Sequence, residues 1–283
     1  MGRYKQYAAE FLLVGTTIVI GVLGFWDIYF GAAPNPQPHH HLHVVTTYLW
    51  MGLLLTQLVL LSRGSRAKHR RLGLAVIVAG PLLVASAAML TVHSAHRALI
   101  SGEEDILIVH NVLGTGWLAL LLLLAFALKK RRKVHGALLS STLVLFLGPA
   151  IFFALIAFAP PFRIEGPETF YRFRTAGLAG QGIILAAVLV LFLKDRRNNW
   201  PYPFAAAGFW LAEVIKAWLT RLDLIDPLTR IVGGPSQSTT FAVTFAAVAT
   251  LLAAIVFPLG RKGPGLRPPP DQTRETSGGK VTA

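Results

Sequence analysis

The chain has 283 residues, of which 54% are hydrophobic and only 14% are charged, whereas a typical soluble domain carries about 25% charged residues. The formal net charge of +14 would suit a nucleic-acid partner, but the positive residues lie in short runs between apolar segments, which is typical of membrane topology. The chain has no cysteine, which excludes disulfides, thiolate metal sites and cysteine nucleophiles.

Eight apolar segments are long enough, or nearly so, to cross a bilayer, which takes about 20 residues for about 30 Å of hydrocarbon. The first follows Glu10 without an obvious cleavage site before Phe30, so it predicts a retained span rather than a signal peptide. The seventh is short and contains Glu213 and Lys216. The sequence predicts an all-α, polytopic membrane protein with about eight transmembrane helices, over residues 11–30, 43–61, 72–93, 106–128, 136–158, 174–193, 202–219 and 241–259.

The connecting segments alternate in charge. Most of the 27 lysines and arginines lie on the side that also holds both termini. The opposite side holds only Arg97, Arg163, Arg172, Arg174, Arg221 and Arg230. Positive loops stay in the cytoplasm, so we expect a bacterial inner-membrane protein with both termini cytoplasmic.

The predicted spans divide the chain into four regions. Residues 1–42 hold the first transmembrane helix and an outer loop rich in histidine and proline, and residues 43–158 hold spans two to five as a four-helix bundle. Residues 159–260 hold three further transmembrane helices. The tail, residues 261–283, is rich in proline, glycine, threonine and charge, which predicts disorder.

All nine histidines lie between His39 and His135. Histidine is costly in or near a bilayer and is the commonest metal ligand, so this clustering predicts a site in the first half of the chain. The predicted topology places most of them at the outer face and puts only His69 and His135 at the cytoplasmic face. His39, His40 and His41 follow a proline-rich stretch, and we expect them in a solvated loop.

One predicted site is a metal centre at the outer face. His93 and His96 are three residues apart and share a helix face. With His110 they form the predicted ligand set for copper, iron or zinc, and His43 is an optional fourth ligand. The acidic residues of the adjoining loop either add carboxylate ligands or simply face water; they are Glu103, Glu104 and Asp105.

The alternative site binds haem b. His43 and His110 open alternate spans at the outer face, and His69 and His135 open alternate spans at the inner face. Helices two apart in sequence lie diagonally in an up-down bundle, and two facing histidines are what axial haem ligation needs. This arrangement predicts an outer and an inner haem and therefore an electron path across the membrane.

Charged residues in the seventh predicted span suggest a third interpretation of the protein's function. Glu213 and Lys216 are three apart and are expected to form a structural pair on one helix face. With Asn111 and Gln181 they could instead line a polar path, as expected of a transporter. A transporter or a cofactor-free scaffold therefore remains an alternative function for the chain.

Four short motifs resemble a known family: Lys68-His69-Arg70-Arg71-Leu72-Gly73, His93-Ser94-Ala95-His96, Ile108-Val109-His110 and Arg131-Arg132-Lys133-Val134-His135-Gly136. In order and spacing they resemble the histidine positions of small bacterial four-helix membrane proteins of unknown function linked to assembly of haem-copper cytochrome oxidase. That resemblance implies a compact bundle whose histidines hold haem or copper. The histidines at 39–43 and three further spans after Phe158 depart from it. The layout is also similar to transmembrane di-haem cytochromes b.

The sequence favours a haem- or metal-binding membrane protein in electron transfer or oxidase assembly, whose partners are the lipid bilayer and a respiratory oxidase or quinone, and not nucleic acid. The alternatives are a metal-dependent oxidoreductase acting on a lipid or quinone at the outer leaflet, and the transporter or scaffold. Whether the protein is an enzyme stays open.

Overall fold

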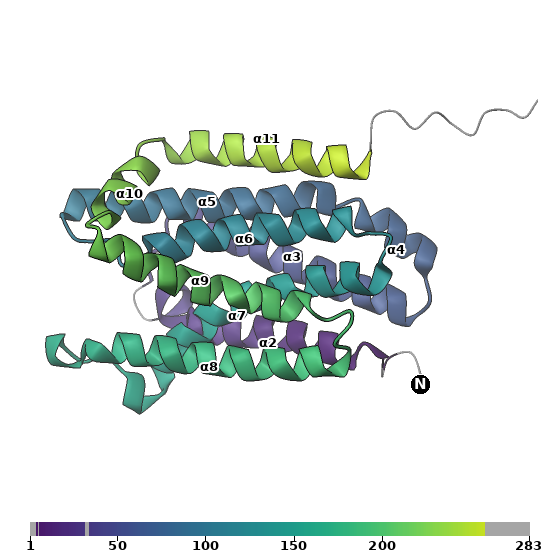
Figure 1. Ribbon diagram of the computed structural model, residues 1–283, viewed down its shortest axis with the longest axis horizontal. Coiled ribbons are helices and arrows are strands. Elements are labelled where there is room, and N and C mark those ends of the chain that lie inside the picture. The colour runs from purple at the N-terminus through teal and green to yellow at the C-terminus, as the bar shows by residue number, and fades with distance from the viewer. Residues whose placement is uncertain (1–3, 5, 32–33, 258–283) are drawn as a thin grey trace, which may run out of the picture.

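A computed structural model describes residues 4, 6–31 and 34–257, and in these residues the fold is all-helical without strands. Long helices lie side by side along one direction (Figure 1). They are α2 (Ala8–Gly24), α3 (Pro38–Ser62), α5 (Val76–Ser101), α6 (Ile108–Ala127), α7 (Arg132–Phe158), α8 (Tyr171–Lys194), α9 (Pro201–Arg221) and α11 (Gln237–Val256). Shorter elements connect them: η1 (Trp26–Phe30), α4 (Arg66–Gly73), η2 (Pro160–Phe162), η3 (Pro167–Thr169) and α10 (Ile225–Val232).

Within the described residues, six helical segments are long and apolar enough to cross a membrane: α3, α5, α6, α7, α8 with the preceding η3, and α11. The helix α2 is apolar but has only 17 residues. Large apolar side chains are exposed on the outside of the bundle, including Val190, Val214 and Val243. An exposed apolar surface of this kind suits contact with lipid. The protein therefore has the all-helical, multi-pass organisation of a membrane protein.

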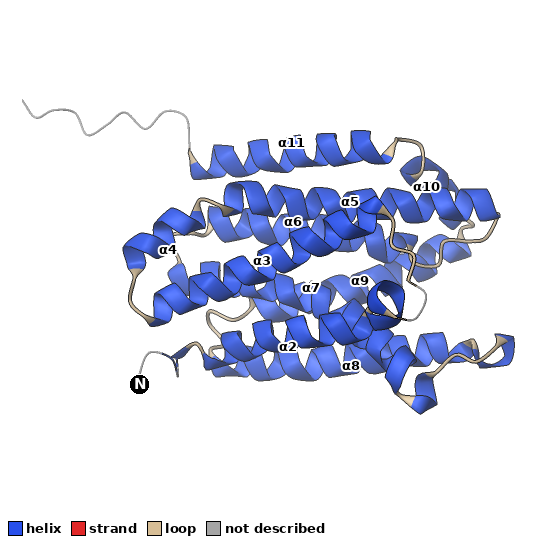
Figure 2. Cartoon of the chain, turned by 180° about the vertical axis from the view of Figure 1, so that it is seen from behind, coloured by secondary structure: helices blue, strands red, loops and turns tan. Residues whose placement is uncertain are grey.

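The bundle has one main core. Consecutive helices α3, α5, α6 and α7 contact one another, α2 packs most extensively on α7, and α11 packs most extensively on α5. Figures 1 and 2 both show α11 along one side of the bundle and α2 with α8 along the other. The fully buried Trp50 of α3 donates its indole N–H to Thr142 Oγ1 of α7 at 2.9 Å. Buried indoles need such a partner, and this bond fixes how α3 lies against α7.

The structure corrects the predicted boundary at residue 42. His39, His40 and His41 do not form a loop, because α3 begins at Pro38. Proline suits the first helical position, where its missing N–H removes no hydrogen bond. Gln37 then closes a capping box with His40, so the proline-rich stretch ends in a helix start. The tail at 261–283, predicted to be disordered, lies outside the described residues.

A second boundary differs from the prediction. Residues Arg66–Gly73 form the separate helix α4, and α5 runs from Val76 to Ser101 rather than over 72–93. The end of α5 is set by Gly102, whose φ of +71° is left-handed. Glycine adopts that conformation without the steric cost of a Cβ atom. Because α5 is longer at this end than predicted, it carries His93 and His96 well inside the helix.

Candidate metal centre

Three histidines meet at the end of the bundle where α3 begins and α5 ends, which we call the histidine-rich end. His39 and His40 come from the first turn of α3, and His93 comes from α5. Each offers one ring nitrogen, and these nitrogens lie within 4.8 Å of one another. In a tetrahedral site with metal–nitrogen bonds of about 2.0–2.1 Å, ligand nitrogens are about 3.4 Å apart. Small ring rotations would therefore bring the three to coordination distance.

The rings of the triad are packed against one another. The His39 and His93 ring centroids are 3.8 Å apart, and those of His39 and His40 are 4.2 Å apart. His39 Nε2 is buried and has no hydrogen-bond partner among the described residues. A buried polar atom without a partner is costly. Coordination to a metal ion through Nε2 would satisfy this nitrogen, so the missing partner agrees with a metal site formed by the triad.

Local hydrogen bonds constrain the other two rings. The Gln37 backbone N–H donates to His40 Nδ1 at 2.9 Å, which places the proton of a neutral His40 on Nε2. A metal bound at Nε2 would move that proton to Nδ1 and end the hydrogen bond, so metal binding and the capping box compete. From α11, the Gln237 side-chain amide lies 3.4 Å from His93 Nδ1. Such outer contacts orient ligating histidines.

The other histidines at this end have separate partners. His41 Nδ1 contacts the Tyr29 hydroxyl of η1. His96 donates from Nε2 to the Gly233 carbonyl after α10, at 2.7 Å. The predicted ligand set of His93, His96 and His110 is therefore not brought together. On α5, His93 faces the start of α3, whereas the neighbouring turn of His96 is covered by the residues that follow α10.

Each histidine of the predicted outer haem pair has a hydrogen-bond partner on a different helix. His43 Nδ1 bonds with Ser86 Oγ of α5 at 3.1 Å, and His110 Nε2 bonds with Glu213 Oε1 of α9 at 3.2 Å. Ser86 donates its own proton to the Leu83 carbonyl. The other ring nitrogen, His43 Nε2, lies 3.5 Å from Thr47 Oγ1, so both ring nitrogens of His43 have hydroxyl partners.

The predicted inner pair lies at the opposite end of the bundle, where the two histidines are neighbours. Burial lowers the pKa of His69 below its ordinary value, and the charge of nearby His135 lowers that pKa further. His135 donates from Nδ1 to the Ala125 carbonyl at 2.7 Å. This bond leaves Nε2 of His135 as the free acceptor, which is the usual orientation of a ligating histidine.

One polar cluster joins Glu213 to Gln181, which the predicted polar path also groups together, and adds His110, which that predicted path does not include. Glu213, expected to pair with Lys216, instead accepts hydrogen bonds from His110 of α6 and from the Gln181 amide of α8, each at 3.2 Å. His110 Nδ1 and Gln181 Oε1 are buried without partners among the described residues. Neighbouring charges three residues apart suggest a local pair, and no local signal shows that a helix distant in sequence supplies the partner.

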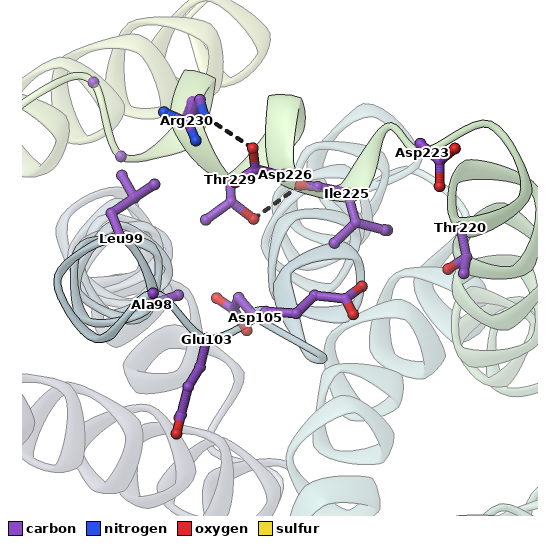
Figure 3. A pocket seen from close by; sticks show the side chains of 14 residues that line it. Ala98, Leu99, Glu103, Asp105, Thr220, Asp223, Ile225, Asp226, Thr229 and Arg230 are labelled. Atoms are coloured by element: carbon purple, nitrogen blue, oxygen red, sulfur yellow. Dashed lines mark hydrogen bonds and ion pairs between the residues drawn. The ribbon is translucent and has the colours of Figure 1, made fainter.

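Two cavities adjoin the histidine-rich end. One has a volume of about 260 Å³ and an apolar lining, and both His40 and His43 reach its wall together with Tyr48, Phe146 and Pro149. The other has a volume of about 820 Å³ and lies beside α10. Figure 3 shows its acidic lining. The apolar cavity thus reaches the triad at His40, and the acidic cavity adjoins the end of α5, the helix that carries His93.

Comparison of the chain with family models, with curated proteins and with solved structures found no match. The resemblance to oxidase-assembly proteins and to di-haem cytochromes b therefore stays a prediction from the residues alone.

Proposed function

We propose that the protein is a bacterial inner-membrane protein that binds a transition-metal ion through His39, His40 and His93 at the outer face. The observation that carries this proposal is the meeting of three ring nitrogens within 4.8 Å. They come from two helices that are far apart in sequence, and His39 also has a buried ring nitrogen, Nε2, without a partner among the described residues. Such a set of side chains supplies three ligands and leaves a coordination position open.

The topology is part of the proposal. In it α2 and α9 join the six apolar helices to give eight spans, with both termini in the cytoplasm. Three observations support this count. The helix α9 has 21 residues, and α2 is followed by the aromatic element η1. Both helices pack on α7 within the bundle. The orientation rests on the positive residues of the loops.

The donor set favours particular metals. Imidazole ligands suit zinc, copper and iron, and the chain has no cysteine to supply a thiolate. With copper or iron the centre can exchange single electrons, which agrees with a role in electron transfer or in the assembly of a respiratory oxidase. A haem at the opposite end remains compatible with the neighbouring His69 and His135, whereas the separate partners of His43 and His110 disfavour an outer haem.

The apolar cavity favours a second function, that of a metal-dependent oxidoreductase acting on a lipid or quinone at the outer leaflet. His40 belongs to the triad and also lines this cavity. His43 and Thr47 also line the cavity, where the Thr47 hydroxyl contacts His43 Nε2 at 3.5 Å, so the wall carries polar groups that a hydroxyl or carbonyl of a substrate could contact. A largely apolar pocket with a few polar groups is the usual form of a small-molecule site.

Metal analysis of the detergent-purified protein tests the proposal, with an oxidised-minus-reduced absorption spectrum of the same sample. We expect about one metal ion per chain, and its loss in the triple variant His39→Ala/His40→Ala/His93→Ala. His41→Ala is the matched control, because His41 lies in the same helical turn and bonds instead with Tyr29. Equal metal content in the triple variant and the wild type would contradict the proposal.

A further inference from the structure

The acidic cavity gathers much of the negative charge of a positively charged protein. Five of the 13 acidic residues line it: Glu103, Glu104, Asp105, Asp223 and Asp226. They come from the loop between α5 and α6, from the turn between α9 and α10, and from the first turn of α10. Its one lining cation, Arg230, forms an ion pair with Asp226 at 2.9 Å. Carboxylates from two separate segments thus face one space of about 820 Å³, which creates a negative potential there.

One of these carboxylates lacks a partner although it is buried. Asp105 is only 8% exposed. Its Oδ1 accepts a hydrogen bond from the Leu107 backbone N–H at 3.0 Å, but its Oδ2 is buried and has no partner among the described residues. Figure 3 shows the Asp105 carboxylate directed into the space below Thr229 and Ile225. Burial of an unpaired carboxylate is costly, and a cation in the cavity would offset that cost.

The wall of the cavity continues to the histidine triad along α5. Leu99 lines the cavity, and His96 and His93 follow on preceding turns of the same helix. His96 is bonded to Gly233, itself part of the cavity wall. At a rise of 1.5 Å per residue, the six residues from Leu99 to His93 span about 9 Å. Arg97 opposes the approach of a cation along this path, so the carboxylates are needed to offset its charge.

We propose that the acidic cavity is a capture site for hydrated divalent transition-metal cations and that it supplies the histidine triad. This inference rests on the proposed function, because it needs a triad that binds metal. Carboxylate oxygens hold hydrated cations weakly, whereas imidazoles bind transition metals more tightly. A cation therefore enters the cavity quickly, exchanges with solvent, and passes along α5 to the stronger ligands.

The rate of zinc loading tests the proposal. Full-length protein in detergent at low ionic strength is mixed with Zn²⁺, the reaction is stopped with chelator, and retained zinc is measured over time. We expect Glu104→Gln/Asp105→Asn to slow loading about tenfold and to reduce its dependence on salt, with unchanged zinc content at equilibrium. Glu165→Gln/Glu168→Gln is the control, because it removes two charges from the α7–α8 loop at the same end. Loading of the cavity variant at the wild-type rate would overturn the proposal.

A second measurement separates this inference from the proposed function. In His39→Ala/His40→Ala/His93→Ala, the cavity should still bind Zn²⁺ weakly, with a dissociation constant of about 0.1–1 mM, as open carboxylate sites do. Adding Glu104→Gln/Asp105→Asn should abolish that binding. Loss of weak Zn²⁺ binding in the combined variant supports the cavity as a cation site. If the wild-type protein shows no tight Zn²⁺ site, that result contradicts only the histidine triad. Weak binding that survives the added substitutions overturns the cavity.

Discussion

His110 Nε2 lies 3.2 Å from Glu213 Oε1, and this contact joins α6 to α9. The Gln181 amide of α8 reaches the same carboxylate oxygen. Three helices that are separate in sequence thus share one polar cluster. Polar contacts between helices in a membrane are modest in energy but restrict how the helices pack.

The first prediction concerns this cluster. Glu213→Ala should lower the free energy of unfolding in detergent by about 0.6–1.7 kcal/mol, which runs from the average to the largest value found for hydrogen bonds between membrane helices. Lys216→Ala should change it much less, because no ion pair within 4 Å joins Lys216 to Glu213 in the described part of the chain. Thermal unfolding followed by circular dichroism measures both. A larger loss of stability in Lys216→Ala than in Glu213→Ala would support the Glu213–Lys216 pair expected from the sequence.

A second prediction tests the packing of α2 on α7. A Cβ atom on Gly24 would clash with the Ala150 backbone, whereas a Cβ atom on Gly15 would meet nothing within 4 Å. Gly24→Ala should therefore destabilise the protein by about 1–3 kcal/mol. Gly15→Ala should be neutral or should stabilise it by up to about 1 kcal/mol, because alanine favours the helix. Similar melting temperatures for the two variants would contradict the close approach of α2 and α7.

The topology can be tested with single cysteines, since the chain has none of its own. A membrane-impermeant maleimide should label Glu103→Cys in intact cells. Lys68→Cys should react only after the cells are opened. Both side chains are exposed, so accessibility reports the side of the membrane rather than burial. The reverse labelling pattern would show that the histidine-rich end faces the cytoplasm.

The pH dependence of stability tests the surroundings of His69. Burial and nearby His135 lower the pKa of His69, so the unfolded chain binds a proton more readily than the folded protein does. The contribution of neutral His69 to stability is present above its unfolded pKa of about 6.5, and it is lost as pH falls through the lower folded pKa. His69→Gln should flatten the fall in melting temperature below pH 6.5, and an unchanged pH profile would show that His69 is not the group responsible.

The long apolar runs predicted most helices, because apolar length is a local property of the sequence. The prolines before His39 predict a loop, and this prediction is wrong because Pro38 suits the first helical turn of α3. A proline directly before the apolar run is the signal that predicts this helix start. The choice of partners depends on packing between distant helices: α5 brings His93 to His39, and α9 brings Glu213 to His110. No local pattern contains that information.

The central claim is that His39, His40 and His93 bind one metal ion. X-ray absorption at the edge of the metal found by elemental analysis tests it most directly. We expect a shell of about three nitrogen ligands near 2.0 Å with the outer-shell scattering of imidazole rings, and loss of that signal in His93→Ala. A shell without imidazole scattering, or an identical spectrum for His93→Ala, would contradict the claim.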